Sequence, residues 1–555
     1  MRLSISRRRP PSDSRGGTFA RLALVAVALA TVLAVAAGTS VGSPSSKKGL
    51  RASNILTIAL PGDVETLDSA FAHEQISNEV RYNTSDRFFR YAEVPGPGGI
   101  PVYNVKKILG ESIQSWKLSK DGKRLTLNVR RGAKFCHTGN PVTADDFVYW
   151  FQRTFGAKGS SLFNVQSVFI PGPNAVTKTG PYQFQIRFSQ PSPLFFFIYR
   201  DQANAPVDSK AMKAHATSSD KWTTKWAAKN DAGSGPYCVD RILSGVEADL
   251  STNPGYWGTK PYFDKVLLKI VPSSTDRVLL LQRGSIDVAE QLSTDELDRL
   301  RKSNGVKVVS VPTRNQILVG LNAKMKPFNN RLVRQALSYA VPYGDIVNSV
   351  YKKHALKPDS VIAITGAFHK KGLWPYRFDL NKAKSLLKQA GYGNGFPMKL
   401  YIATGNSTFE ELAILLRSNF SKIGVKVNIV KQPAGTFAEG LNNHRDQAWL
   451  RDLLWYVDDP GYTGDIFYKT TGVLNWMSYS NPKLDKIIKQ MSAIWRPSDR
   501  AKKARLATQY QKILSADAPT LILAQTNFEI AMRSNICGYQ QLPDNLLQYY
   551  VLKRC

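Results

Sequence analysis

Residues 399–430 show a strand pattern, a helical pattern and a second strand pattern in direct succession. KLYIA is followed by TFEELAILLRSNFSKIG and then by VKVNIV. Two strands joined through a helix pair in parallel by a right-handed crossover, because both strand and helix twist with that hand. Strands and helices alternate in both halves of the chain, so the sequence predicts an α/β fold.

The length of 555 residues makes a single hydrophobic core implausible. Cores stop growing at roughly 250–300 residues, so at least two domains or lobes are expected. Aromatic residues make up 10% of the chain, which argues against a disordered polymer. Beyond the first forty residues no apolar run reaches the roughly 20 residues of a membrane span, which excludes a polytopic membrane protein.

The N-terminal segment has the composition of an export signal. Residues 1–21 carry six arginines and one acid, the apolar stretch 22–37 follows, and small polar residues come next. This order is typical of a secretory signal peptide, with a plausible cleavage site at 34–36 and a processing region that extends to residue 43. The alternative is an uncleaved anchor, for which sixteen apolar residues are short. Both interpretations place the body of the protein outside the cytoplasm, periplasmic or at the outer face of the membrane. The apolar stretch has no nearby Cys for a lipid.

Four cysteines, at 136, 238, 537 and 555, permit two disulfides in an exported chain. Cys537 and Cys555 are close together at the C-terminus, so we expect them to pair. The partner of Cys136 is left open, as is that of Cys238.

The formal net charge of +33 is high. Without residues 1–50 the chain retains 67 basic and 41 acidic residues, a net of +26, so the signal explains little of the excess. The positive residues are spread along the chain and form no compact basic-aromatic motif, so nucleic acid is not an expected partner. Contact with anionic membrane lipid or envelope polymer is the more plausible use of this charge.

The usual signatures of catalysis are missing. The GxSxG string at 38–42 follows the signal segment rather than a strand, so it does not predict a hydrolase elbow. The six histidines form no paired metal motif. The GxGxG at 391–395 follows a helix and indicates a cap, not a dinucleotide site. We therefore expect no enzyme, no metal and no cofactor.

Local signals predict several elements. Asp121-Gly122 between two alternating segments predicts a hairpin. Thr143 with Asp146 three residues later resembles a capping box, and Asp379 is the expected N-cap of a later helix.

The segment 449–468 combines aromatic and charged side chains. It holds Trp449, Trp455, Tyr456 and Tyr462 together with Arg451, Asp452, Asp458 and Asp459. Such a combination suits a ligand cleft. An ordinary strand end followed by an Asp-Pro-Gly turn, with Asp459 serving the turn, explains the same residues equally well.

The order of signatures along the chain resembles the family 5 extracellular solute-binding proteins, the dipeptide-, oligopeptide- and nickel-type receptors of ABC importers. The resemblance extends from residue 54 to 530 and rests on short stretches in family order. They include ETLD at 65–68, SWKLSKDGKRLTLNVRRGAKF, NPVTADDFVYWFQR, GSGPY, NPGYWGTKPYFDKV, KPFNNRLVRQALSYAV, DLNKAKSLLKQAGY, WYVDDP and ILSADAPTLIL.

The resemblance implies a two-lobed periplasmic-binding-protein-like fold with an extra domain, and lobes that close by a hinge around a buried ligand. Lobe I is expected at 51–95, 215–312 and 523–555, domain II at 96–214, and lobe III at 313–522. The resemblance also implies that the protein is a monomeric receptor. It would capture di- or oligopeptides, or a related amine-bearing solute, and deliver them to the permease subunits. A secreted hydrolase or a basic envelope-binding protein is the alternative.

The family's Trp-x-x-Asp motif falls on Trp455 and Asp458. In peptide-binding members this Asp pairs with the ligand's α-amino group, and Trp455 would supply an apolar wall. Oligopeptide members can carry Arg three residues before the Trp, where this chain has Asp452 beside Arg451. Strand alternation puts these two side chains on opposite faces, and an Asp452 that faces the cleft favours a cationic ligand. Ala72 and His73 are expected to line the side of lobe I, and Tyr456 and Tyr462 complete the set.

Overall fold

The computed structural model describes residues 54–555 except 73, 201–203, 456 and 495. The signal segment 1–43 and the candidate residues His73 and Tyr456 therefore lie outside the described residues. The described part belongs to one compact unit. Within it, no helix is both long enough and apolar enough to cross a bilayer.

An eleven-stranded mixed sheet dominates the fold, in the order β15-β14-β16-β12-β17-β11-β1-β10-β9-β8, with β13 also paired to β17. Its strands are β1 (Ile55–Leu60), β8 (Tyr237–Leu243), β9 (Glu247–Thr252), β10 (Lys265–Ile270), β11 (Val288–Ala289), β12 (Val306–Leu321), β13 (Ala355–Leu356), β14 (Phe396–Ala403), β15 (Val425–Gln432), β16 (Ala448–Leu454) and β17 (Thr520–Arg533).

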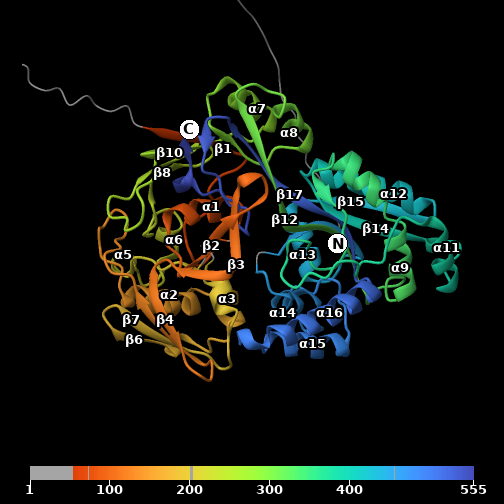
Figure 1. Ribbon diagram of the computed structural model, residues 1–555, viewed down its shortest axis with the longest axis horizontal. Coiled ribbons are helices and arrows are strands. Elements are labelled where there is room, and N and C mark those ends of the chain that lie inside the picture. The colour runs from red at the N-terminus through yellow and green to blue at the C-terminus, as the bar shows by residue number, and fades with distance from the viewer. Residues whose placement is uncertain (1–53, 73, 201–203, 456, 495) are drawn as a thin grey trace, which may run out of the picture. The chain divides into compact units, whose positions relative to one another are not determined.

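The long strands β12 and β17 lie side by side in an antiparallel pair and connect the two halves of the sheet (Figure 1). The first part of β12 runs beside the portion of β17 that also pairs with β11, and its last part pairs with β16. Their register shifts between Pro312 and Gln316 and again between Ile317 and Leu318. These irregularities fall where the predicted boundary at 312 separates lobe I from lobe III. The domain boundaries themselves stay a prediction.

Smaller sheets complete the strand inventory. A four-stranded sheet has the order β4-β5-β7-β6, and two sheets of two strands each, β2-β3 and β18-β19, stand apart. Their strands are β2 (Phe89–Pro95), β3 (Pro101–Gly110), β4 (Ile113–Leu118), β5 (Arg124–Val129), β6 (Val176–Gly180), β7 (Gln183–Arg187), β18 (Ile536–Cys537) and β19 (Lys553–Arg554). The hairpin predicted around Asp121-Gly122 is confirmed as β4–β5, and Gly122 adopts a φ of 72° there.

Helices pack on these sheets. The first half of the chain contains α1 (Gln75–Thr84), α2 (Ala144–Ala157), α3 (Ser161–Ser167), α4 (Phe195–Ile198), α5 (Ser209–Ala214), α6 (Thr224–Ala227), α7 (Ser274–Arg283) and α8 (Thr294–Leu300). The second half contains α9 (Arg331–Tyr339), α10 (Tyr343–Asp345), α11 (Leu380–Gln389), α12 (Ser407–Ser421), α13 (Ala434–Asn442), α14 (Pro460–Thr463), α15 (Pro482–Ser492) and α16 (Arg500–Asp517). Short 3₁₀ or π turns are η1 (Pro97–Gly99), η2 (Pro173–Ala175), η4 (Ile346–Val350), η5 (Gly464–Tyr468), η6 (Pro497–Asp499) and η7 (Tyr549–Val551).

The predicted strand-helix-strand unit is confirmed as β14, α12 and β15, whose strands pair in parallel. Thr143 and Asp146 form the predicted capping box of α2, in which the Thr143 N–H donates to Asp146 Oδ2 at 2.8 Å. Asp379 caps α11 as expected. Each of these features depends on residues close together in the sequence.

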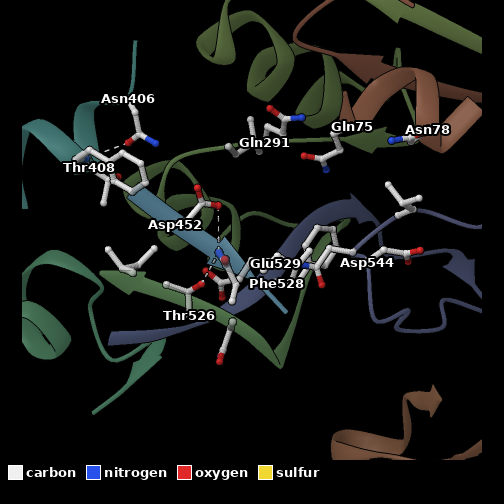
Figure 2. Close-up of a pocket in the computed structure, with 18 of the residues that line it drawn as sticks. Gln75, Asn78, Gln291, Asn406, Thr408, Asp452, Thr526, Phe528, Glu529 and Asp544 are labelled. Atoms are coloured by element: carbon white, nitrogen blue, oxygen red, sulfur yellow. Dashed lines mark hydrogen bonds between the residues drawn. The ribbon is translucent and has the colours of Figure 1, made fainter. Parts of the chain in front are cut away.

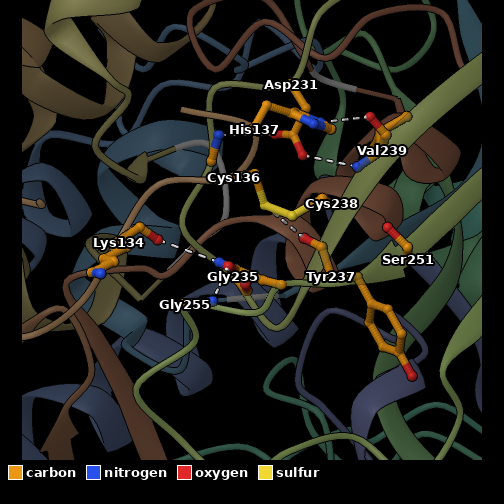
Figure 3. Close-up of a disulfide and its surroundings, with 12 residues drawn as sticks. Lys134, Cys136, His137, Asp231, Gly235, Tyr237, Cys238, Val239, Ser251 and Gly255 are labelled. Atoms are coloured by element: carbon orange, nitrogen blue, oxygen red, sulfur yellow. Dashed lines mark hydrogen bonds between the residues drawn. A yellow bond between two sulfur atoms is a disulfide. The ribbon is translucent and has the colours of Figure 1, made fainter. Parts of the chain in front are cut away.

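Two disulfides are present. Cys537 pairs with Cys555, as predicted. Cys136 pairs with Cys238, the partnership that the sequence left open (Figure 3). This second bond fastens the loop after β5 to strand β8, and the Cys136 N–H also donates to the Gly233 carbonyl at 2.9 Å.

The buried apolar side chains form separate cores. The largest gathers residues between Ile317 and Ala524, and another gathers residues of β1, β8–β10 and the C-terminal segment. A third is rich in aromatic rings around Phe88, and it also contains Val457, Tyr462 and Ile466. The segment after β16 thus packs against the core that contains α2 and β5.

Candidate ligand-binding site

A cavity of about 680 Å³ lies among segments from both predicted lobes. This volume is within the range of small-molecule sites, roughly 300–1,000 Å³. The lobe I side and α3 contribute Ala72, Gln75, Asn78, Ser160, Phe163, Asn164, Gln291, Leu292, Thr294, Leu297, Thr526, Asn527, Phe528, Glu529, Asp544, Asn545 and Leu546. The lobe III side contributes Asn315, Ile317, Tyr351, His354, Asn406, Thr408, Phe409, Asp452 and Leu454.

The charged groups of this lining are predominantly acidic. Figure 2 shows Asp452, Glu529 and Asp544 around the same cavity. The described lining residues include no Lys and no Arg, although the chain as a whole carries a net charge of +33. The cavity therefore has the opposite charge to the protein that surrounds it.

Asp452 belongs to β16 and lies opposite Ile317 of β12. Its Oδ2 receives a long hydrogen bond of 3.5 Å from Asn315 Nδ2, which places one amide beside the carboxylate. The neighbouring Arg451 is absent from the cavity lining, and its guanidinium lies 4.6 Å from the centre of the Trp476 ring. Burial lowers the pKa of Arg451, while the nearby Asp452 opposes that change.

Glu529 already has a cationic partner, Arg301, and a neighbouring histidine within the protein. Its Oε1 lies 2.5 Å from Arg301 Nη2 and 3.2 Å from His354 Nδ1. Its charge is thus largely balanced before any ligand arrives.

Asp544 is the third acid of the lining, and its side chain is 11% exposed. The Arg200 guanidinium is 3.9 Å away, beyond hydrogen-bond distance. Neither carboxylate oxygen of this buried group receives a hydrogen bond from the described residues.

Asp458, the family-derived partner for an α-amino group, lies elsewhere. It lines a small cavity of about 30 Å³ together with Trp455 and Arg314. Its Oδ1 is 3.0 Å from Arg314 Nη1 and accepts a hydrogen bond of 2.6 Å from the Ala367 N–H. A ligand-binding role for Asp458 stays a prediction, and in this structure the protein itself balances its charge.

Trp455 is buried, and its Nε1–H donates to Gln316 Oε1 at 2.7 Å. Its ring meets Phe467 edge to face. These contacts hold the ring in the largest apolar core, beside the small cavity.

The remaining candidates divide between the large cavity and the interior. Ala72 lines the cavity of 680 Å³, and Tyr462 is buried in the aromatic-rich core. Asp459 stabilises the local backbone, as expected for an Asp-Pro-Gly turn. The segment is the short helix α14, however, rather than a simple turn. The Asp459 carboxylate accepts from the Gly461 and Tyr462 N–H groups and also contacts Lys503.

Sequence reasoning missed Glu529 and Asp544 as cavity residues. Neither belongs to a recognisable motif, and both reach the cavity through strand order and a C-terminal loop. Among the described residues there is no group of three or more His, Cys, Asp or Glu side chains arranged to hold a metal ion.

A two-lobed α/β protein with a cavity between segments of both lobes belongs to the class of extracytoplasmic binding proteins. Comparison with known proteins identifies the family. The model of the bacterial extracellular solute-binding proteins, family 5 (middle region), matches residues 107–475. The chain belongs to this family and is a solute-binding protein rather than an enzyme.

Curated relatives support the same placement. The chain is 26% identical over 510 residues to the "Probable D,D-dipeptide-binding periplasmic protein DdpA" of Escherichia coli, with 88% of this chain and 91% of that protein covered. It is 25% identical over 557 residues to the "Oligopeptide-binding protein AppA" of Bacillus subtilis, with 94% and 97% covered.

Solved structures share the fold. The periplasmic binding protein DppA of Helicobacter pylori, in complex with the peptide STSA, gives a TM-score of 0.78 at 22% identity, with 90% of this chain and 98% of that chain covered. NikA of Brucella suis, in complex with Fe(III)-EDTA, gives 0.78 at 17% identity, with 90% and 100% covered. These similarities confirm the predicted two-lobed fold.

Proposed function

We propose that the protein is the extracytoplasmic receptor of an ABC importer that captures short peptides and delivers them to the membrane permease. The names of its curated relatives point to D,D-dipeptides, dipeptides and oligopeptides. Family membership gives no support to the alternative of a secreted hydrolase.

The observation that carries the peptide assignment is the free edge of β16. β12 pairs with β16 from Ala448 to Leu454, whereas β14 pairs with it only at Ala448 and Trp449. The part of β16 beyond Trp449 contributes Asp452 and Leu454 to the cavity. An extended peptide can add to such an edge as a further strand, since its backbone supplies the matching N–H and C=O groups.

The cavity also has the charge that a peptide N-terminus requires. Asp452 projects from the strand that offers the free edge, and its carboxylate accepts a long hydrogen bond of 3.5 Å from the Asn315 amide. A carboxylate and an ammonium group form a charge-assisted hydrogen bond, which is stronger than a neutral one. Asp458 is the second candidate, and a ligand ammonium there would have to share the carboxylate with Arg314.

Capture by closure of the lobes requires that the ligand bind the closed form more tightly than the open form. The register shifts in β12, between Pro312 and Leu318, provide a place for the required bending. We propose that the protein acts as a monomer, that residues 1–43 direct its export, and that its net charge of +26 after residue 50 holds it near anionic envelope polymers.

Native mass spectrometry of the purified protein, incubated with a defined di- to pentapeptide library, tests the proposal. Bound intact peptides are the expected result. Cleaved products would contradict a receptor role, and a protein that binds no library member would contradict the peptide assignment.

A further inference from the structure

The cavity contains two carboxylates that the protein leaves without a cation at hydrogen-bond distance, Asp452 and Asp544. They belong to distant elements, strand β16 and the loop between β18 and η7. Figure 2 labels both side chains at the cavity, together with that of Glu529. Glu529 differs from both, because Arg301 and His354 contact it directly.

Asp544 is the more unusual of the two. Both of its oxygens are buried, and neither accepts a hydrogen bond from the described residues. Arg200 is 3.9 Å away and its guanidinium also lies 4.5 Å from the centre of the Tyr91 ring, so this cation is engaged elsewhere as well. A buried carboxylate without hydrogen bonds is unfavourable, because it has lost water and gained no equivalent donor.

A pair of buried glutamates lies close to Asp544. Glu79 and Glu290 are buried there and interact with each other, next to the lining residues Asn78 and Gln291. Burial raises the pKa of Glu79, and the charge of Asp544 adds to that effect.

We infer that Asp544 determines specificity by binding the side-chain cation of a basic peptide, so that ligands with Lys or Arg are preferred over neutral and acidic ones. This inference rests on the proposed peptide-receptor function. Either Asp452 or Asp458 would bind the terminal ammonium group of the peptide. In both cases Asp544 is left to bind a second positive charge, that of a basic side chain. The ligand then supplies one cation to each side of the cavity.

Isothermal titration calorimetry on the mature chain tests this inference with Ala-Ala-Ala, Ala-Lys-Ala and Ala-Glu-Ala. We expect Ala-Lys-Ala to bind at least about tenfold more tightly than Ala-Ala-Ala, because a desolvated charge pair is worth more than one unit of log Kd. Ala-Glu-Ala should bind most weakly. The preference should shrink as the salt concentration rises.

Variants separate charge from folding. Asp544→Asn should lose the preference for Ala-Lys-Ala over Ala-Ala-Ala, and Asp544→Glu should keep that preference. The matched control is Asp240→Asn, the same chemical change at an exposed position of β8. An unchanged thermal midpoint for Asp544→Asn shows that the variant is folded.

The outcomes distinguish the inference from the function on which it depends. Equal affinity for Ala-Lys-Ala and Ala-Ala-Ala, or an Asp544→Asn variant that retains the Lys preference, would overturn the inference and leave the receptor function intact. Failure of all three peptides to bind, with binding of a diamine such as putrescine, would overturn the peptide function instead.

Discussion

Asp458 Oδ1 lies 3.0 Å from Arg314 Nη1, and both side chains are almost fully buried. Arg314 comes from the irregular stretch of β12, and its guanidinium also lies 5.2 Å from the centre of the Tyr103 ring. The pair thus connects the segment after β16 to the strand that runs through both lobes. Asp458, which the family motif predicts to bind ligand, is thus paired with Arg314 of the protein itself.

The first prediction concerns Asp458→Ala. The substitution leaves the buried Arg314 without its carboxylate, which should lower the free energy of unfolding by about 3–5 kcal/mol. If Asp458 also binds the ligand ammonium, the variant should show no rise in thermal midpoint when peptide is added. Thermal denaturation with and without peptide measures both effects. An undiminished peptide-induced rise would remove Asp458 from the binding site.

A control for this variant is Asp465→Ala. Asp465 pairs with Lys469 at the surface, where both side chains are at least one-third exposed. Such pairs contribute at most about 1 kcal/mol, so the control should keep both its stability and its response to peptide.

The second prediction compares the two disulfides. Cys136–Cys238 spans 102 residues and Cys537–Cys555 spans 18. In the chain-entropy account the longer loop restricts the unfolded chain more, about 4.7 against 3 kcal/mol. Replacing Cys136 and Cys238 by Ala should therefore lower the urea midpoint more than replacing Cys537 and Cys555. The reverse order would show that local packing at the C-terminus outweighs loop length.

The third prediction is a dependence of stability on pH. Burial, reinforced by the neighbouring Glu79, raises the pKa of Glu290 well above its usual range. Above about pH 4.3 the unfolded chain releases this proton and the folded protein retains it, so the free energy of unfolding falls as pH rises towards the folded-state pKa.

Glu290→Gln removes that titration. The free energy of unfolding of the variant, minus that of the wild type, should increase from pH 4.5 to pH 8. This holds whichever of the two proteins is more stable at a given pH. Urea unfolding at several pH values measures the difference. Parallel curves for the two proteins would show that Glu290 does not titrate in this interval.

The fourth prediction follows from the charge. If the net +26 after residue 50 holds the mature protein against anionic envelope components, a wash at high salt should release more of it from cells than a wash at low salt. Immunoblots of the wash fractions measure the release. Equal release would leave the positive surface without this role.

Local sequence determined the features whose partners are neighbours in the chain. The hairpin at Asp121-Gly122 and the capping box of Thr143 with Asp146 depend on backbone geometry over a few residues. The parallel unit of β14, α12 and β15 follows from periodicity and the handedness of crossovers. The family resemblance added the two-lobed architecture, which no single motif predicts.

The tertiary structure alone decided the charge pattern of the cavity and the partners of its acids. Asp452 and Asp544 reach one cavity from distant segments, and Asp458 meets Arg314 although 144 positions separate them. The pairing of Cys136 with Cys238 depends in the same way on where β8 lies in the sheet. Sequence patterns describe which face of an element is buried, but contact between distant side chains depends on how the elements pack. A chain with a net charge of +33 can therefore have an acidic cavity that its composition does not reveal.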